Sequence, residues 1–314
     1  MNTALSPIYP LAKLLKRSTL SKMYTAYMRP YHDYADVVFD GHITTHDELR
    51  LERMQNRIAR LTTGAPFRTP TNKLRFDIGW ETLKTRRETH RLTLFHKLTH
   101  FSNTQPNYIL SILPQTRISN TNRNLRNANT RTLPANNTTS FQRSFVPKTT
   151  RKWNLLPPST REQIHTPTFK KEVAELLGCS SPPLYFSFGS KLGNCLHTKI
   201  RTGTLPLNAY LFQLQKSESS SCRCGFPNEH IRHFVLNCNL YRAQRNILFR
   251  KISETLNYDF ACLPTEHIFD ILLNGTTLHP EDGRRVAECF QSYVQETLAL
   301  RRVAAGGGGV AAPL

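Results

Sequence analysis

Apolar side chains recur at helical spacing in three stretches of the first hundred residues. The first stretch predicts a helix over residues 11–29, which Pro30 is expected to end. The second stretch predicts a helix over 45–63, and the third predicts one over 81–101. Because this spacing places the apolar side chains on one face, each helix should bury that face against a core. Residues 1–101 are therefore expected to form a helical region.

The helix over 45–63 has the clearest boundaries. Its apolar face is formed by Leu51, Met54, Ile58 and Leu61. Thr45 and Glu48 have the spacing of an N-terminal capping box, in which each side chain binds the other residue's backbone N–H. Gly64 follows the last turn, where a residue with positive φ commonly ends a helix.

Beyond residue 101 the apolar pattern weakens. Residues 102–150 are rich in Asn, Thr, Ser and Pro, which favours extended, loop-like chain. A short helix is expected over Thr168–Leu177, followed by a hinge over 178–189 that contains two adjacent prolines. The predicted fold is mainly α, with a helical region over 1–101, a basic loop-rich connection over 102–189, a small helical C-terminal domain over 190–303 and a flexible tail over 304–314.

Charge changes this picture more than composition does. The chain has 314 residues with 42 Lys and Arg against 22 Asp and Glu, a formal net charge of +20. A field of this size indicates a polyanionic partner, and nucleic acid, RNA or DNA, is the commonest one. No acidic residue occurs between Thr89 and Arg161, so the polyanion is expected against the first half and the middle of the chain.

The arginines of the helix over 45–63 are a candidate phosphate-binding stripe. Arg50, Arg53, Arg57 and Arg60 lie beside its apolar face, and guanidinium groups match phosphate oxygens in geometry. The alternative is an ordinary solvated helix surface, partly offset by Glu48 and Glu52. Further nucleic-acid contacts are expected from Arg86, Arg87, Arg91, Arg126, Arg143, Lys148, Arg151, Lys152 and Arg201.

Aromatic and basic residues also alternate between 141 and 155. Phe141, Phe145 and Trp153 stand among Arg143, Lys148, Arg151 and Lys152. Aromatic side chains in such a setting can stack on bases while the cations hold phosphates. The competing interpretation is that the aromatics pin this segment onto a neighbouring domain.

Three clustered cysteines and a histidine carry the most specific chemistry. Cys222, Cys224, His233 and Cys238 form the pattern C-x-C-x8-H-x4-C. Thiolate and imidazole ligands at tetrahedral corners are what Zn²⁺ prefers, and four protein ligands make a closed, structural site. Gly225 allows the positive φ that the turn after C-x-C often needs. The sequence therefore predicts one structural Zn²⁺.

Two alternatives accompany this zinc assignment. His230 could replace His233 as the fourth ligand, or the cysteines could be unrelated free thiols near two histidines. The remaining four cysteines have no such neighbours and are expected to be buried apolar residues. An odd number of cysteines with no apolar signal or membrane segment indicates an intracellular protein, nuclear or cytoplasmic, with no membrane partner.

Several segments, in order, resemble the C-terminal part of non-LTR (LINE-type) retrotransposon reverse transcriptases. The similar segments are Met23–Pro30 with Tyr34-Ala35, Leu51–Leu61 with Gly64, Gly79-Trp80 with Leu83, Arg86-Arg87 and His90-Arg91, Asn124–Asn127, Ser144–Pro147 with Trp153–Pro157, Ile200–Gly203 with Leu207-Asn208, and the C-x-C…H…C knuckle. No single segment is very specific, but their order is. The resemblance implies a thumb-like helical region followed by a zinc-knuckle tail that grips element RNA or target DNA.

The polymerase chemistry of that family is not expected here. Nucleotidyl transfer requires paired carboxylates on a Y-x-D-D turn to hold two metal ions. Tyr34-Ala35-Asp36-Val37 resembles the start of that motif but lacks the second aspartate, and it aligns beyond the palm. The palm and any endonuclease would lie before Met1, so we expect a catalytically silent remnant. The alternatives are an enzyme, or a co-opted structural protein that binds another protein.

Overall fold

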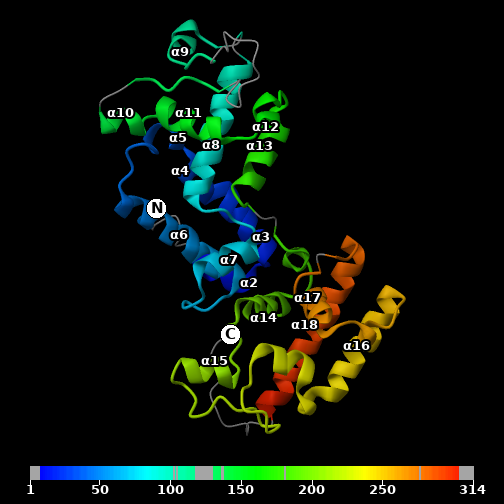
Figure 1. The fold of residues 1–314 in the computed structure, drawn as a ribbon. Coiled ribbons are helices and arrows are strands. Elements are labelled where there is room, and N and C mark those ends of the chain that lie inside the picture. Colours follow the sequence, from blue (N-terminus) through cyan, green and yellow to red (C-terminus); the bar gives the residue numbers. More distant parts are fainter. Residues whose placement is uncertain are drawn as a thin grey trace. The chain divides into compact units, whose positions relative to one another are not determined.

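The computed structural model describes residues 8–101, 103, 105–116, 130–135, 138–179, 182–275 and 277–303 (Figure 1). Within these residues the chain is mainly α, as predicted, and the only β pairing is an isolated bridge between Thr116 and Arg131. The α-helices are α2 (Ile8–Leu14), α3 (Arg17–Met23), α4 (Arg29–Asp33), α5 (Asp36–Phe39), α6 (Thr45–Thr63), α7 (Thr71–Ile78), α8 (Leu83–His100), α9 (Asn107–Ser111), α10 (Thr139–Arg143), α11 (Phe145–Leu155), α12 (Pro158–Glu162), α13 (Thr166–Leu176), α14 (Lys191–Thr202), α15 (Asn208–Gln213), α16 (Arg242–Leu256), α17 (Thr265–Leu273) and α18 (Pro280–Val303). Short π and 3₁₀ turns are η1 (Tyr24–Met28), η3 (Leu184–Ser187), η4 (His233–Asn237), η5 (Asn239–Tyr241) and η6 (Phe260–Cys262).

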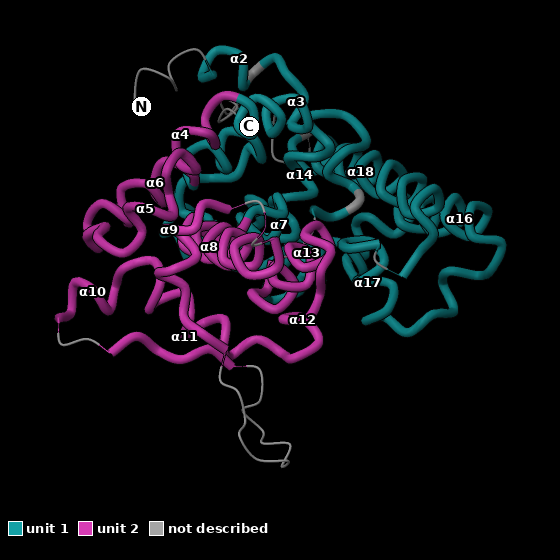
Figure 2. Tube along the Cα trace, turned by 90° about the horizontal axis from the view of Figure 1, so that it is seen from above, with its two compact units in different colours: residues 1–26, 56–80, 181–314 teal, residues 27–55, 81–180 magenta. Residues whose placement is uncertain are grey.

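The chain forms two compact units, and each is built from separate pieces of sequence (Figure 2). Unit 1 contains residues 1–26, 56–80 and 181–314, and unit 2 contains residues 27–55 and 81–180. This differs from the contiguous division expected from composition. The helical region is shared between the units. Of the predicted connection over 102–189, residues 102–180 belong to the same unit as α8 and residues 181–189 belong to unit 1.

The core of unit 1 lies among α14, α16, α17 and α18. α18 packs against the other three helices, and Ile200, Ile252 and Phe290 are among the side chains that are almost fully buried there. The chain from Phe234 to Leu236 enters the same core. A small helical assembly with one shared apolar centre is therefore the frame on which the cysteine-rich segment is mounted.

The core of unit 2 forms where α8 packs against α11 and α13. Trp153 is 3% exposed, with its ring centroid 5.2 Å from that of Phe95 and 5.7 Å from that of Phe169. The packing interpretation is thus confirmed for Trp153. The loop expected over 102–150 is wrong in two places, because α9 forms at Asn107–Ser111 and α10 and α11 form from residue 139 onward. Pro147 fits in the first turn of α11, where no backbone N–H is needed.

Three local expectations need correction. Pro30 does not end the helix, because it occupies the first turn of α4, where proline is tolerated. The α6 cap is Thr44, whose Oγ1 accepts from the Asp47 N–H at 3.1 Å, so the pair lies one residue before the expected Thr45 and Glu48. The expected hinge contains η3, in which Tyr185 and Phe186 are buried. The positive φ of Gly64, +67°, agrees with the predicted helix end.

His197 makes the stability of unit 1 sensitive to acid. Its ring stacks on Tyr185 at a centroid distance of 3.8 Å, and burial lowers its pKa to about 3. The unfolded chain, with a histidine pKa near 6.5, then binds a proton that the folded chain does not bind. Stability should fall by about 2 kcal/mol between pH 7 and pH 5. Urea unfolding at pH 7 and at pH 5 measures the free energy of unfolding at each pH. The loss of stability between the two pH values should be smaller in the His197→Gln variant than in the wild type. An equal loss in both proteins would contradict the assignment of this acid sensitivity to His197.

Candidate metal centre and candidate nucleic-acid interface

A tight turn brings the first two cysteines together. The Cys222 N–H donates to the carbonyl of Phe226 at 2.8 Å, and the Gly225 N–H donates to the carbonyl of Cys222 at 3.0 Å. Gly225 has φ of +89°, a conformation that glycine adopts without strain. The turn places Cys222 and Cys224 on the same side of the loop, facing the segment that carries the other two residues of the pattern.

His233 and Cys238 complete the cluster from the two ends of η4. One ligand atom from each of the four residues lies within 4.8 Å of all the others. The Cys222 and Cys238 sulfurs are 3.7 Å apart, and the Cys224 sulfur is 3.2 Å from His233 Nε2. Two thiolates at about 2.3 Å from a tetrahedral ion would be separated by about 3.8 Å. The four residues therefore form a group that could hold a metal ion.

The cluster is joined to the core of unit 1 by the chain between its last two residues. Phe234 and Val235 are fully buried, and their carbonyls accept hydrogen bonds from the Tyr293 hydroxyl at 3.4 and 3.2 Å. Arg245 is buried and donates to the carbonyl of Cys238 at 3.1 Å. The segment that carries His233 and Cys238 is thus held to the core of unit 1 by burial and hydrogen bonding.

Burial also sets the protonation of the cluster. It raises the pKa of the Cys222 thiol to about 12 and raises the pKa of Cys238 as well, while it lowers the pKa of His233. A neutral imidazole is the form that binds metals. Thiols so placed ionise only when a cation lies beside them, which is how a divalent ion promotes thiolate binding.

His230, the alternative to His233 as the fourth metal ligand, lies outside the cluster. It is exposed, its Nδ1 accepts the His233 backbone N–H at 2.9 Å, and the metal-ligand group does not include it. The expectation of buried apolar cysteines holds poorly elsewhere: Cys262 is exposed, and Cys179, Cys195 and Cys289 are only partly buried.

Glu229 is a residue of this centre that the sequence pattern did not reveal. It is 3% exposed, and its carboxylate accepts from Arg301 at 2.7 and 3.1 Å and from the Asn208 backbone N–H at 2.7 Å. Its Oε1 lies 3.9 Å from the Cys222 sulfur. Arg301 is on α18, so this network ties the loop before His230 to the last helix. No local signal marks a carboxylate whose partner lies 72 residues away.

A second group of possible metal ligands lies in unit 2. Asp33, Asp36 and His90 bring their ligand atoms together, and His90 Nδ1 is 2.5 Å from an Asp36 oxygen. Arg86, however, donates to both oxygens of Asp33 at 2.6 Å. The guanidinium occupies the place at Asp33 that a metal cation would take, so we assign no metal there.

Three of the expected phosphate-binding arginines are engaged inside unit 2. Arg86 pairs with Asp33, Arg87 is 2% exposed with its Nε 2.8 Å from Asp40, and Arg91 lies 3.2 Å from the same carboxylate. Burial acts to raise the pKa of Asp40, yet the hydrogen bond from Lys148 and the charge of Arg91 lower it. These arginines therefore stabilise unit 2, and we leave them out of the interface.

The other basic residues expected to contact nucleic acid are either paired with a carboxylate or exposed. Lys148 binds Asp40 at 2.6 Å, Lys152 binds Glu88 at 2.9 Å, and Arg201 binds Asp77 at 3.0 Å. Arg143 and Arg151 are exposed on α10 and α11. Arg126 lies outside the described residues.

The α6 stripe is exposed over most of its length. Arg53 and Arg57 are exposed, and neither forms an ion pair with any residue the structure describes; Arg50 is 67% exposed with Asp47 at 3.8 Å. Arg60 differs, because its guanidinium lies over the Phe67 ring at 5.3 Å and is half-buried.

Searches of protein-family models, curated proteins and solved structures found no match to this chain. Among the residues the structure describes, no helix combines the length and the apolar character needed to cross a membrane.

Proposed function

We propose that this chain binds nucleic acid through the exposed arginines of α6, aided by Arg143 and Arg151. The observation that carries the proposal is the α6 stripe of Arg50, Arg53 and Arg57, three guanidinium groups left available on one helix. Guanidinium forks bind phosphate oxygens in bidentate geometry. The net charge of +20 supports a polyanionic partner.

The acids near the stripe support this use of it. Glu48 accepts from Arg87 at 2.6 Å, and Glu52 accepts from the Leu83 backbone N–H at 2.6 Å. Both carboxylates are therefore committed to α8 and its N-terminus. The solvated-surface alternative relied on these two acids to offset the stripe.

We further propose that the metal of the four-residue cluster is Zn²⁺ and that its role is structural. Three thiolates and one imidazole are ligands that zinc prefers, and four protein ligands fill its tetrahedral shell. In this proposal Cys222, Cys224, His233 and Cys238 hold the ion, which fixes the polar loop 216–230 against η4. The loop and helices together would form the nucleic-acid-binding tail of a LINE-type reverse transcriptase.

The same proposal treats the chain as catalytically silent. The segment most similar to the polymerase motif contains Asp36, and this carboxylate is bound to His90 at 2.5 Å. Two-metal nucleotidyl transfer needs paired carboxylates open to both ions. The chain would thus contribute binding, with copying done by polymerase residues of the kind that this sequence lacks.

A second candidate function, protein binding, rests on four exposed apolar and aromatic side chains of unit 2. Tyr27, Tyr31, Tyr34 and Val38 are between 64% and 83% exposed and recur at spacings of three and four residues. Exposed aromatic patches often mark protein interfaces. The salt dependence of binding affinity distinguishes the two functions, because affinity that comes from phosphate contacts falls steeply with salt concentration and affinity that comes from apolar contacts does not.

Replacing Arg50, Arg53 and Arg57 together with glutamine should weaken binding to RNA and DNA of any sequence. Each lost phosphate contact should reduce the slope of log K against log salt by about 0.9 on duplex DNA. Fluorescence anisotropy over a salt series measures both quantities. Sequence preference should not change, because phosphate contacts position a protein without reading bases.

The matched control removes the same charge from another exposed helix. Arg242, Arg250 and Lys251 lie exposed on α16, and their replacement with glutamine should change affinity much less. Equal losses in the two triple variants would show that only overall charge matters. Unchanged affinity and slope in the α6 variant would overturn the interface.

A further inference from the structure

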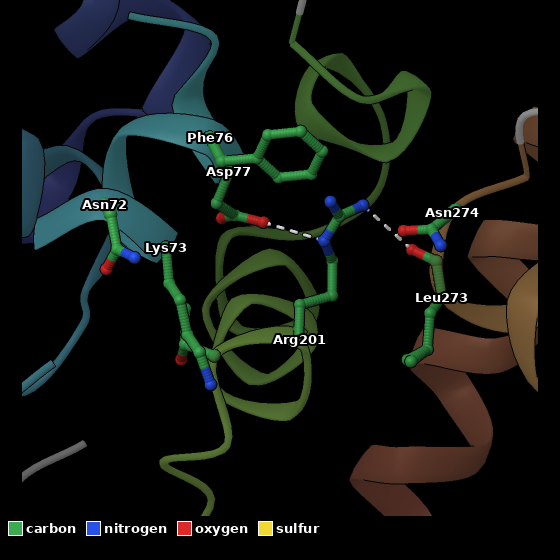
Figure 3. Close-up of a pocket in the computed structure, with 8 residues that line it drawn as sticks. Asn72, Lys73, Phe76, Asp77, Arg201, Leu273 and Asn274 are labelled. Atoms are coloured by element: carbon green, nitrogen blue, oxygen red, sulfur yellow. Dashed lines mark hydrogen bonds and ion pairs between the residues drawn. The ribbon is translucent and has the colours of Figure 1, made fainter. Parts of the chain in front are cut away.

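A cavity of 500 Å³ lies in unit 1, where α7, α14 and the end of α17 meet (Figure 3). Its lining includes Lys73 and Phe76 from α7, Arg201 from α14 and Asn274 just after α17. Nothing in the nucleic-acid interface or the metal centre uses this cavity. A pocket with an aromatic ring, a buried arginine and a lysine has the components needed to hold an anionic aromatic ligand.

Arg201 is fixed at the centre of the cavity by two opposed contacts. Its Nε lies 3.0 Å from Asp77 Oδ1, and its Nη1 donates to the carbonyl of Leu273 at 3.1 Å (Figure 3). The side chain is only 8% exposed. The guanidinium also lies over the Tyr185 ring, 5.3 Å from its centroid. Its Nη2 group forms no hydrogen bond or ion pair with the residues the structure describes, and Arg201 is one of the residues that line the cavity. The protein thus holds this guanidinium rigidly and leaves one of its nitrogens without a hydrogen-bond acceptor among the described residues.

Phe76 and Lys73 stand at the open side of the cavity. Phe76 is 60% exposed, and its only described ring contact is with the Arg201 guanidinium, 5.8 Å from the ring centroid. Lys73 is exposed and has no ion pair or hydrogen bond within the described residues. One turn of α7 therefore presents an uncovered aromatic face and a free ammonium beside the buried arginine.

The charges around the cavity favour an anion. Asp77 is fully buried and neutralised by two arginines, because Arg17 Nη2 also lies 3.3 Å from its Oδ2. Asp77 is the one carboxylate among the residues that line the cavity, and the side-chain amide of the lining residue Asn274 donates to Asp270 at 2.5 Å. With Lys73 added, the cations outnumber the carboxylates at this place.

We propose that this pocket binds one unpaired nucleotide, with its base on Phe76 and its phosphate on Lys73 and the free edge of Arg201. A base inside a duplex has both faces covered, so the pocket selects single-stranded chain or a free nucleotide. Aromatic stacking of this kind tolerates every base. The inference deepens the proposed nucleic-acid binding by naming single-stranded nucleic acid as the form recognised in unit 1.

Phe76→Leu tests the stacking contact without disturbing the core, because the side chain is largely exposed. Anisotropy with a labelled twelve-nucleotide single strand should show about tenfold weaker binding, with the duplex of equal length nearly unaffected. Phe212→Leu is the matched control, since Phe212 is a similarly exposed phenylalanine on α15 outside the cavity. Lys73→Gln should weaken single-strand binding and lower its salt slope, whereas Lys251→Gln should not.

Calorimetric titration with adenosine 5′-monophosphate and with adenosine separates the pocket from the wider interface. Wild type should bind the nucleotide more tightly than the nucleoside, and Phe76→Leu should weaken both. If no polymer binds while the nucleotide still does, the pocket stands and the proposed function fails. If Phe76→Leu and Lys73→Gln match their controls while the α6 variant loses affinity, the pocket inference is overturned and the proposed function stands.

Discussion

Cys238→Ser is expected to release one Zn²⁺ per chain and to open the loop 216–230 to protease. Structural zinc in finger peptides contributes on the order of 10 kcal/mol at neutral pH. The Cys238 residue is fully buried, and its sulfur lies 3.7 Å from that of Cys222, so the serine variant removes one of the three sulfur ligands of the proposed site. Metal analysis of protein purified under reducing conditions, followed by limited proteolysis with mapped cleavage sites, measures both effects.

Cleavage should be confined to the polar side of the cluster. Phe234 and Val235 are anchored in the core of unit 1, and Tyr293 holds their carbonyls, so η4 and α16 should survive the loss of metal. The loop before them relies on Glu229 and on the C-x-C turn. Unit 2 should give the same cleavage pattern with and without zinc, because its core contains none of the ligands.

Two controls sharpen this zinc experiment. Cys289→Ser changes a partly buried cysteine outside the cluster and should keep the full zinc content. His230→Ala should also keep zinc, because His230 binds the His233 backbone N–H and is outside the ligand group. Wild-type protein with far less than one zinc per chain would refute the site, and zinc loss in His230→Ala alone would refute the choice of histidine.

The sequence predicted the metal cluster well because its determinants are local. C-x-C fixes a turn, Gly225 permits its backbone, and a ten-residue segment returns His233 and Cys238 to it. The end of α6 was predictable for the same reason, since Gly64 is adjacent to the helix that it ends. In both cases the interacting groups lie close in the sequence: the four residues of the cluster fall within 222–238, and Gly64 directly follows α6.

The buried arginines could not be predicted because their partners are distant. On α8, the pairs Arg86–Asp33 and Arg87–Asp40 join residues 53 and 47 positions apart, so helical spacing alone cannot separate them from exposed cations. The division into two compact units could not be predicted from the sequence either. Each unit is assembled from separate stretches, whereas composition changes only along the chain.

The helices α10 and α11 were missed because their sequence disfavours them locally. Six of the seventeen residues from Thr139 to Leu155 are Thr, Ser or Pro, whose propensity favours loop over helix. Burial of Trp153 between Phe95 and Phe169 overrides that preference, and it depends on α8 and α13 being in place. Tertiary packing of this kind cannot be inferred from periodicity in the segment alone.

Asp77→Asn is expected to destabilise unit 1 strongly without changing the shape of the side chain. Asp77 is 1% exposed, and it pairs with Arg17 at 3.3 Å and Arg201 at 3.0 Å. Thr198 Oγ1 also donates to its Oδ2 at 2.7 Å, and the Tyr185 hydroxyl donates to its Oδ1. Removing one partner of a buried ion pair costs about 3–5 kcal/mol, because the other charge stays buried without compensation. In Asp77→Asn the guanidinium groups of both Arg17 and Arg201 would stay buried without a carboxylate partner.

The measurement is urea unfolding followed by a probe in each unit, because two units can unfold in separate transitions. Asp77→Asn should lower the midpoint of the unit 1 transition and leave the unit 2 transition in place. Glu288→Gln is the matched control, since Glu288 forms an exposed pair with Arg284 at 3.1 Å on α18. An exposed pair four residues apart on a helix contributes only about 0.3–0.5 kcal/mol. Equal, small shifts for both variants would mean that the arginines find other partners and that Asp77 does not hold unit 1 together.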